Sequence, residues 1–138
     1  MILLDTNVVS ELMRQHPDDQ VLNWLRQQSA EQIYLSALTV AEIRRGLALL
    51  PDGRRKSKLE GAFQQFLDQG FQDRILPFAS ETTLAYAPIY RARVQAGLGV
   101  GELDLLIAAI AKQYRATLAT RNTMDFEACG LKLINPWL

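Results

Sequence analysis

Apolar and polar positions along the chain predict short strands that alternate with helices. An apolar run at Ile2–Leu4 is typical of a buried strand, and further short strands are predicted at residues 32–35, 74–77, 118–120 and 132–134. Between these runs, apolar residues recur every three or four positions, which is the period of a helix. Strands alternating with helices predict an α/β fold with a mostly parallel sheet.

Helix boundaries follow from caps and breakers. Asp5 or Asn7 is predicted to cap the first helix, and Ser36 and Ser80 to cap two later ones. Pro88 is predicted either to bend the helix that contains it or to begin a new one. The predicted helices cover residues 5–13, 21–25, 36 to about 50, 58–67, 80 to about 96, and 103–114.

The length and composition indicate one domain. The 138 residues, 49% of them hydrophobic, suit a single domain over residues 1–138 with a real core. No stretch reaches the roughly 20 apolar residues of a membrane-spanning helix, and an acid at position 5 is unlike a signal peptide. The single cysteine, Cys129, excludes an intramolecular disulfide and suits a reducing compartment. We therefore expect a cytoplasmic domain without membrane contact.

The distribution of charge is more informative than its sum. Fifteen basic and fifteen acidic residues give a formal net charge of zero, which argues against a general polyanion binder. It does not exclude a nuclease, which needs acids at its metal and bases around it. Residues 44–58 carry six cations and only Asp52 as an acid. That segment is either a solvated helix–loop face or a surface that docks phosphate or an acidic partner.

Acids near the ends of predicted strands are the candidates for chemistry. Asp5 directly follows the first strand, and ligands of open α/β sheets gather beyond the carboxyl ends of strands. Asp is also among the best N-caps. Glu42 lies one turn into its helix, where Thr39-x-x-Glu42 matches a capping box. Both acids therefore have a structural interpretation beside the functional one.

Asp104 is the only charged residue in the apolar helical segment LDLLIAAIA. A helix that is apolar all round is normally buried, and a buried carboxylate costs on the order of several kcal/mol unless a cation or hydrogen-bond donors compensate it. We therefore expect that a nearby metal and the N-terminus of the helix together compensate the charge of Asp104. Asn122 and Asp125 follow another predicted strand, although ordinary turns also favour these residue types.

Carboxylates without a histidine or cysteine cluster indicate Mg²⁺ or Mn²⁺ rather than zinc. The chain has one histidine, His16, and one cysteine, Cys129. It lacks a glycine-rich phosphate loop and a plausible Ser–His pair, so nucleotide-dependent and acyl-transfer chemistry lack their residues. Acids around a divalent cation suit phosphodiester hydrolysis, because the cation lowers the pKa of a water and neutralises charge on the phosphate.

Three segments carry a resemblance to a known family. In chain order, they are MILLDTNVVSEL, LSALTVAEIRRGLALL and LDLLIAAIAKQYRATLATRNTMDFEACGLKLINPWL. Together, and in this order, they resemble the PIN-domain toxins of the VapC family, and within it the FitB-like branch. The resemblance implies a three-layer α/β/α sandwich that cleaves RNA with Mg²⁺ or Mn²⁺. It also implies a homodimer and a cognate VapB- or FitA-like antitoxin, with operator DNA bound only through that antitoxin.

The resemblance also implies roles for individual positions. Asp5 and Asp104 match direct metal ligands. Glu42 matches the acid that binds metal through water or positions the attacking water. The positions that match supporting residues of the family are Thr6, Asn7 and Thr120.

The fourth acid is a departure from part of the family. Asn122 stands where some FitB-like members have an aspartate, and Asp125 follows three residues later. Because Asn122 adds no negative charge, we expect one tightly held ion, with any second ion recruited by the RNA. Asp125 either faces the site or only caps the turn at Phe126.

The expected reaction is in-line attack by water, leaving a 5′-phosphate and a 3′-hydroxyl. Transfer RNA is the substrate that the family suggests. The candidates to hold the RNA backbone, or acidic groups of an antitoxin, are Arg44, Arg45 and Arg121.

Two alternatives remain open at this point. A phosphoacceptor domain of the receiver or haloacid dehalogenase type also has an aspartate after its first strand. The dehalogenase type needs a second aspartate at position 7, which is Asn7, and no well-placed catalytic lysine follows a later strand. The other alternative is a PIN-like fold that has lost catalysis and serves as a binding or regulatory subunit, although Asp5, Glu42 and Asp104 are all present.

Overall fold

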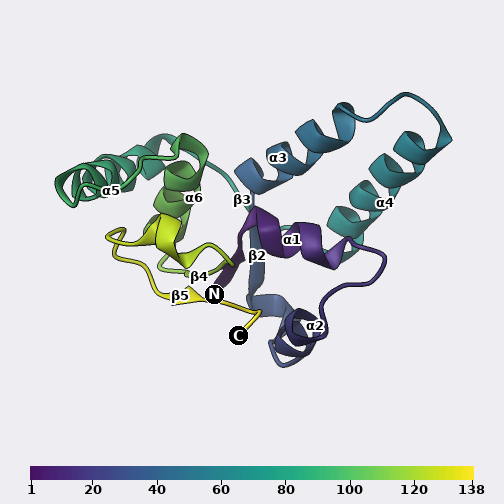
Figure 1. The fold of residues 1–138 in the computed structure, drawn as a ribbon, viewed down its shortest axis with the longest axis horizontal. Coiled ribbons are helices and arrows are strands. Elements are labelled where there is room, and N and C mark those ends of the chain that lie inside the picture. Colours follow the sequence, from purple (N-terminus) through teal and green to yellow (C-terminus); the bar gives the residue numbers. More distant parts are fainter.

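The computed structural model describes residues 1–138, and its first four strands are separated by pairs of helices (Figure 1). Three short 3₁₀ turns, η1 to η3, lie between the main elements. In chain order, the elements are β1 (Ile2–Leu4), α1 (Thr6–Leu12), α2 (Asp19–Arg26), η1 (Ala30–Gln32), β2 (Ile33–Ser36), α3 (Ala37–Ala48), α4 (Arg54–Gly70), β3 (Ile75–Leu76), η2 (Ser80–Thr82), α5 (Thr83–Gln95), α6 (Glu102–Gln113), β4 (Thr117–Ala119), η3 (Thr123–Phe126) and β5 (Leu133–Ile134).

The five strands form one sheet in the order β3-β2-β1-β4-β5, and every neighbouring pair is parallel. Leu3 of β1 lies opposite Tyr34 on one side and Leu118 on the other. From β1 the chain adds β2 and β3 on one side, then crosses back to add β4 and β5 on the other. The strand order therefore reverses between β1 and β4, which is where open α/β sheets form their binding sites.

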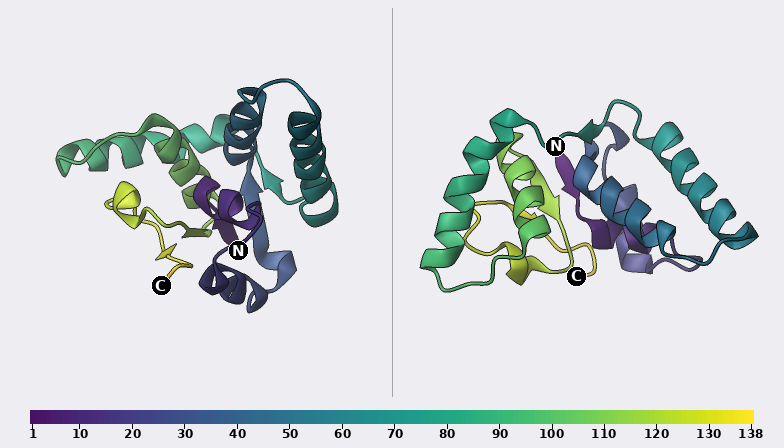
Figure 2. Two further views of the ribbon diagram at one scale, coloured as in Figure 1. Left: turned by 45° about the vertical axis from the view of Figure 1, so that its right-hand side comes forward. Right: turned by 90° about the horizontal axis from the view of Figure 1, so that it is seen from above.

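Two apolar cores cover the two faces of the sheet, because successive strand residues point to opposite faces. Leu3 and Leu118 belong to the core under α5, α6 and η3. Leu4 and Ala119, each one position later, belong to the core under α1 to α4. The two groups of helices lie on opposite sides of the sheet (Figure 2). The predicted three-layer α/β/α sandwich is therefore confirmed.

Of the predicted helix caps, Asp5 and Ser36 are correct and Ser80 is not. The Asp5 side chain caps α1 by accepting from the Thr6 amide, and Ser36 caps α3 by accepting from the Thr39 amide. Ser80 caps nothing: it lies within η2, where the Thr82 hydroxyl accepts from the Ala79 amide instead.

Two helices differ in extent from the predicted ones. Helix α4 begins at Arg54, four residues before the predicted start at Lys58. The apolar face that predicted this helix starts only at Leu59, and the exposed first turn carries no apolar residue. Helix α5 continues through Pro88, so the proline begins no new helix.

The basic segment 44–58 lies on the α3–α4 hairpin, which projects from the sheet (Figure 1). Lys56 is tied down there: its ammonium donates to the Ala48 carbonyl at 3.0 Å and to Asp52 at 3.1 Å. The remaining cations of the segment are exposed. No helix of the chain is both long enough and apolar enough to cross a membrane.

Candidate active site

The carboxyl ends of β1, β2 and β4 surround a cavity of about 450 Å³. It opens where the strand order reverses. Four residues that the sequence singled out line it: Asp5, Glu42, Asp104 and Asn122. Segments that are far apart in the sequence therefore meet at the one place where the topology favours a ligand.

Asp5 is the best-supported side chain of this cavity. It is buried, and its Oδ1 accepts from the Thr6 amide at 2.8 Å. Its Oδ2 accepts from the Thr120 hydroxyl at 2.8 Å and from the Asn7 amide group at 3.3 Å. The two interpretations of Asp5 are therefore compatible: the same carboxylate caps α1 and lines the cavity.

Asn7 and Thr120 connect Asp5 to the loop after β4. The Asn7 amide also donates to the Thr120 hydroxyl at 3.3 Å, and its carbonyl oxygen accepts from the Arg121 amide at 3.2 Å. The Thr120 hydroxyl accepts in turn from the Asn122 amide at 3.1 Å. This network fixes the loop after β4 against the start of α1.

Glu42 is joined to the first acid through Thr6. The Thr6 hydroxyl donates to Glu42 Oε1 at 2.6 Å, and the other Glu42 oxygen lies 3.9 Å from the Arg45 guanidinium. The capping-box interpretation of Glu42 is wrong, because α3 begins after Ser36 and Thr39 is already inside the helix. Glu42 is thus free to face the cavity.

Asp104 is half-buried rather than buried, contrary to the expectation from its apolar neighbours. It lies in the first turn of α6, whose apolar side chains fill the core while Asp104 faces the open cavity. The backbone at Gly101 approaches closely: a Cβ added there would stand 3.3 Å from Asp104 Oδ2. Glycine at this position therefore leaves room for the carboxylate.

Asn122 and Asp125 occupy different positions at the site. Asn122 lines the cavity, whereas Asp125 is exposed in η3 and its side chain makes no hydrogen bond. Its charge nevertheless raises the pKa of both Asp5 and Asp104. Asp125 therefore adds to the negative potential of the cavity without lining it.

Burial and neighbouring negative charges raise the pKa values of Asp5 and Asp104. Burial is the largest cause of the raised pKa of Asp5; hydrogen bonds from Thr120 and Thr6 oppose it, and the charges of Glu42 and Asp125 add to it. Burial also leads in raising the pKa of Asp104 to about 6, followed by the charges of Asp5, Asp125 and Glu42. Such an excess of negative charge favours a cation.

The donor set suits a hard divalent cation. Carboxylate, amide and hydroxyl oxygens line the cavity, and neither His16 nor Cys129 reaches it. No three acidic, histidine or cysteine side chains of the chain stand close enough together to enclose an ion by themselves. That arrangement fits Mg²⁺, which keeps several waters and takes only one or two carboxylates from a protein.

Of the three cations that the sequence suggested, only Arg121 lines the cavity. Arg121 lines the cavity, and its guanidinium stacks over the Trp137 ring at 5.0 Å. Arg44 does not line it, because its side chain donates to Gln64 and stacks on Phe63 between α3 and α4. Arg45 contacts the site only through Glu42.

Arg14 and Glu11 are lining residues that the sequence analysis missed. Buried Glu11 accepts from Arg14 through both oxygens at 3.2 Å and from the Asp18 amide at 3.1 Å. Arg14 is otherwise exposed, so the pair holds a guanidinium at the rim. Their spacing of three positions on α1 was the available indication, since such residues are neighbours on a helix.

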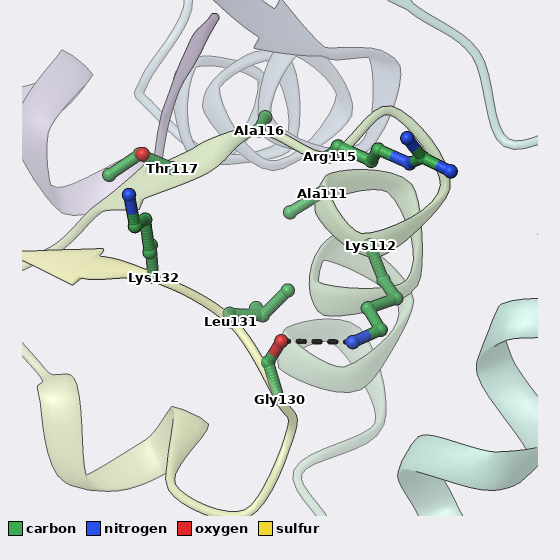
Figure 3. Close-up of a pocket in the computed structure, with 8 residues that line it drawn as sticks. All are labelled: Ala111, Lys112, Arg115, Ala116, Thr117, Gly130, Leu131 and Lys132. Atoms are coloured by element: carbon green, nitrogen blue, oxygen red, sulfur yellow. Dashed lines mark hydrogen bonds between the residues drawn. The ribbon is translucent and has the colours of Figure 1, made fainter.

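A second cavity lies at the opposite edge of the sheet and has the opposite charge (Figure 3). Its charged lining residues are Lys112, Arg115 and Lys132, with no acid among the lining residues. Lys112 donates to the Gly130 carbonyl at 3.0 Å. This second cavity therefore offers no carboxylate to a metal, unlike the one at the carboxyl edge.

Comparison with known proteins agrees with this geometry. A family model described as PIN domain matches residues 2–130. The chain belongs to the PIN-domain family. A VapC ribonuclease of Sinorhizobium fredii is 42% identical over 99% of this chain and 98% of that protein. Toxin FitB of Neisseria gonorrhoeae is 44% identical over 99% of both chains.

The fold of this PIN domain is similar to that of a solved complex. A chain in the structure of FitAB bound to a DNA fragment matches with a TM-score of 0.94 and 43% identity, over 100% of this chain and 96% of that one. The resemblance to the VapC family and its FitB-like branch is thus confirmed. Membership of the PIN-domain family overturns the phosphoacceptor alternative.

The raised pKa of Asp104 predicts how stability depends on pH in the absence of metal. Between its usual value of 3.8 and about 6, the folded chain binds more protons at Asp104 than the unfolded chain does. The free energy of unfolding should therefore fall as the pH rises through this window, with Asp5 adding in the same direction. Urea denaturation in EDTA at a series of pH values measures this dependence.

Asp104→Asn should flatten that dependence and make the metal-free protein more stable at pH 7. The exposed Asp19, in the first turn of α2, provides the control Asp19→Asn. If the free energy of unfolding depended on pH equally in the wild type and in Asp104→Asn, the raised pKa of Asp104 would be refuted.

Proposed function

We propose that this protein is a divalent-metal-dependent endoribonuclease and the toxin of a toxin–antitoxin pair. The observation that carries the proposal is the set of acids around Asp5 at the point where the strand order reverses. The relatives named ribonuclease and toxin support the same chemistry. We propose that residues 1–138 form one such domain.

In this proposal, Asp5 and Asp104 bind the cation, and Asp125 or Asn122 completes the site. When bound, Mg²⁺ or Mn²⁺ supplies a water of lowered pKa and neutralises charge on the phosphate. Asp5 is already oriented by Thr6, Thr120 and Asn7, so little reorganisation is needed. The raised pKa of Asp104 supports its role, because a bound cation would offset the burial and the neighbouring negative charges that disfavour its charged form.

Glu42 is proposed to orient the attacking water and accept its proton. The Thr6 hydroxyl holds one Glu42 oxygen at 2.6 Å, which fixes the carboxylate toward the cavity. Water attack on phosphorus forms one P–O bond and breaks the bond to the 3′ oxygen, which takes up a proton. The products are a 5′-phosphate and a 3′-hydroxyl.

Arg14 and Arg121 are proposed to hold phosphates of the RNA on the two sides of the acids. Both guanidiniums line the cavity, and each is braced, by Glu11 or by the Trp137 ring. Guanidinium groups pair with phosphate through two hydrogen bonds. Arg45, beside Glu42, remains a further candidate, and transfer RNA remains the substrate that we expect.

Cleavage of a transfer-RNA preparation tests the enzyme. With Mg²⁺ or Mn²⁺ the purified protein should cut the RNA, and EDTA should abolish cutting. Asp5→Ala and Asp104→Asn should each lower the rate by about 100-fold or more, because each removes a ligand and its charge from the site. Electrophoresis with end-group analysis measures both rate and product.

Asp19→Asn provides the matched control, because this exposed acid lies on α2 outside the cavity and should leave cleavage unchanged. A 2′,3′-cyclic phosphate product would contradict water attack. Absence of cleavage by folded, antitoxin-free protein with either metal would favour the alternative, a PIN-like binding or regulatory subunit without catalysis.

The antitoxin part of the proposal rests on the similarity to FitB and to the FitAB complex with DNA. We propose that a FitA- or VapB-like antitoxin binds this chain. In the resulting complex, only the antitoxin contacts operator DNA. We also propose that two copies of this chain form a homodimer and that the assembly is cytoplasmic. The acidic cavity offers a cationic segment of the partner a place to bind.

Expression in a bacterial host tests this relationship. Induction of the wild-type chain should arrest growth, and co-expression of a small DNA-binding protein encoded beside it should relieve the arrest. Asp5→Ala should be harmless without the neighbour, because it cannot cleave RNA. Continued arrest despite stable expression of the neighbour would contradict the pairing.

A further inference from the structure

Arg93 is a buried cation without an acidic partner. It is 5% exposed, near the end of α5, and the three ion pairs of the structure are made by other cations. Arginine is almost never fully buried unless it is paired. Other groups must therefore compensate the charge of Arg93, and their positions indicate the role of this residue.

Backbone carbonyls of two separate segments supply that compensation. The Nε and Nη2 atoms donate to the Gly99 carbonyl at 2.9 and 2.5 Å. The Nη1 atom donates to the carbonyls of Met124 at 3.2 Å and Glu127 at 3.0 Å. A planar guanidinium with donors on three nitrogens can join two segments in this way, whereas a lysine ammonium is a single point.

Each segment leads directly to an acid at or beside the cavity. Gly99 lies in the loop that enters α6, whose first turn carries Asp104. Met124 and Glu127 flank Asp125 on either side, within and just after η3. Asp5 and Glu42, in contrast, are positioned by hydrogen bonds within their own neighbourhood and receive nothing from Arg93.

The electrostatics support the same interpretation. Asp104 and Asp125 carry like charges, and each segment would relieve repulsion by moving away from the other. Arg93 opposes that separation through its hydrogen bonds. Its positive charge also lowers the pKa of Asp104, against the effect of the neighbouring acids.

We infer that Arg93 is a positioning residue of the acidic site, which joins the loop before α6 to η3 and so keeps the charges of Asp104 and Asp125 close to the same cavity. This inference rests on the proposed metal-dependent function. It assigns Arg93 no contact with RNA or metal. Its effect is on the affinity of the cavity for a divalent cation.

Arg93→Lys tests the inference because it keeps the charge but loses the planar set of donors. The matched control is Arg91→Lys, at an exposed position two residues earlier on α5. The affinity for Mn²⁺ can be measured from the electron paramagnetic resonance signal of the free ion. It should fall about tenfold in Arg93→Lys and stay unchanged in Arg91→Lys. Circular dichroism establishes that both variants are folded.

Cys129 gives a second readout that needs neither metal nor activity. It is the single cysteine, is 3% exposed, and lies two residues after Glu127, whose carbonyl Arg93 binds. A thiol-specific reagent should therefore modify Cys129 faster in folded Arg93→Lys than in wild type or Arg91→Lys. In the wild type, Mn²⁺ should slow this modification by holding η3 in place through Asp125.

A purely structural role for Arg93 predicts a different result. It would lower the unfolding temperature and leave Mn²⁺ affinity of the folded variant at the wild-type value, and that outcome would overturn the inference. Asp125→Asn, made in the wild type and in Arg93→Lys, adds a further criterion. The two effects on Mn²⁺ affinity should be non-additive if Arg93 acts by placing Asp125, and additive effects would contradict this.

Failure of the proposed function gives a separate result. If the folded wild type binds no Mn²⁺, the metal-dependent function is wrong, whatever the variant does. If Arg93→Lys does not fold, the wild type decides the matter: unchanged Cys129 modification with and without Mn²⁺ would overturn the inference. Protection of Cys129 by Mn²⁺, lost in Asp125→Asn, would support it.

Discussion

The site depends on one buried carboxylate, that of Asp5, between the two strands where the order of the sheet reverses. Hydrogen bonds to Oδ1 from the start of α1 and to Oδ2 from Thr120 place it there. Thr6 and Asn7 extend the network to Glu42 and to the loop after β4. The parallel register of β1 with its neighbours therefore also sets the positions of the groups around Asp5.

The carboxylates that meet around Asp5 are unfavourable to folding in the absence of a cation. Burial and mutual repulsion raise the pKa of Asp5 and of Asp104, which means that the folded chain holds their charges at a cost. Structures concentrate such unfavourable groups at functional sites. The buried guanidinium of Arg93 binds carbonyls before α6 and around η3, and its positive charge offsets part of that cost by lowering the pKa of Asp104.

Sequence patterns predicted the layers of the fold and the acids, because both depend on local rules. The apolar run at Ile2–Leu4 predicted a buried strand, and Asp5 and Ser36 had the residue types of N-caps. The degree of burial of Asp104 could not be predicted, because it depends on which side of α6 meets the open edge of the sheet. Arg93 gave no indication of its contacts either, since it looks like an ordinary surface arginine of a helix. Its contact with η3 exists only in three dimensions, whereas the pairing of Arg14 with Glu11 could have been read from their spacing on α1.

The central claim is that the acids at the carboxyl edge of the sheet together bind one divalent cation. Thermal unfolding of antitoxin-free protein at increasing Mg²⁺ or Mn²⁺ tests it most directly, because a ligand of the folded state raises the unfolding temperature. Asp5→Asn is the matched variant, since asparagine is also a good N-cap for α1. The account predicts a saturable rise in the wild type and none in Asp5→Asn. An unfolding temperature that does not respond to metal in the wild type, or that rises equally in both proteins, would contradict it.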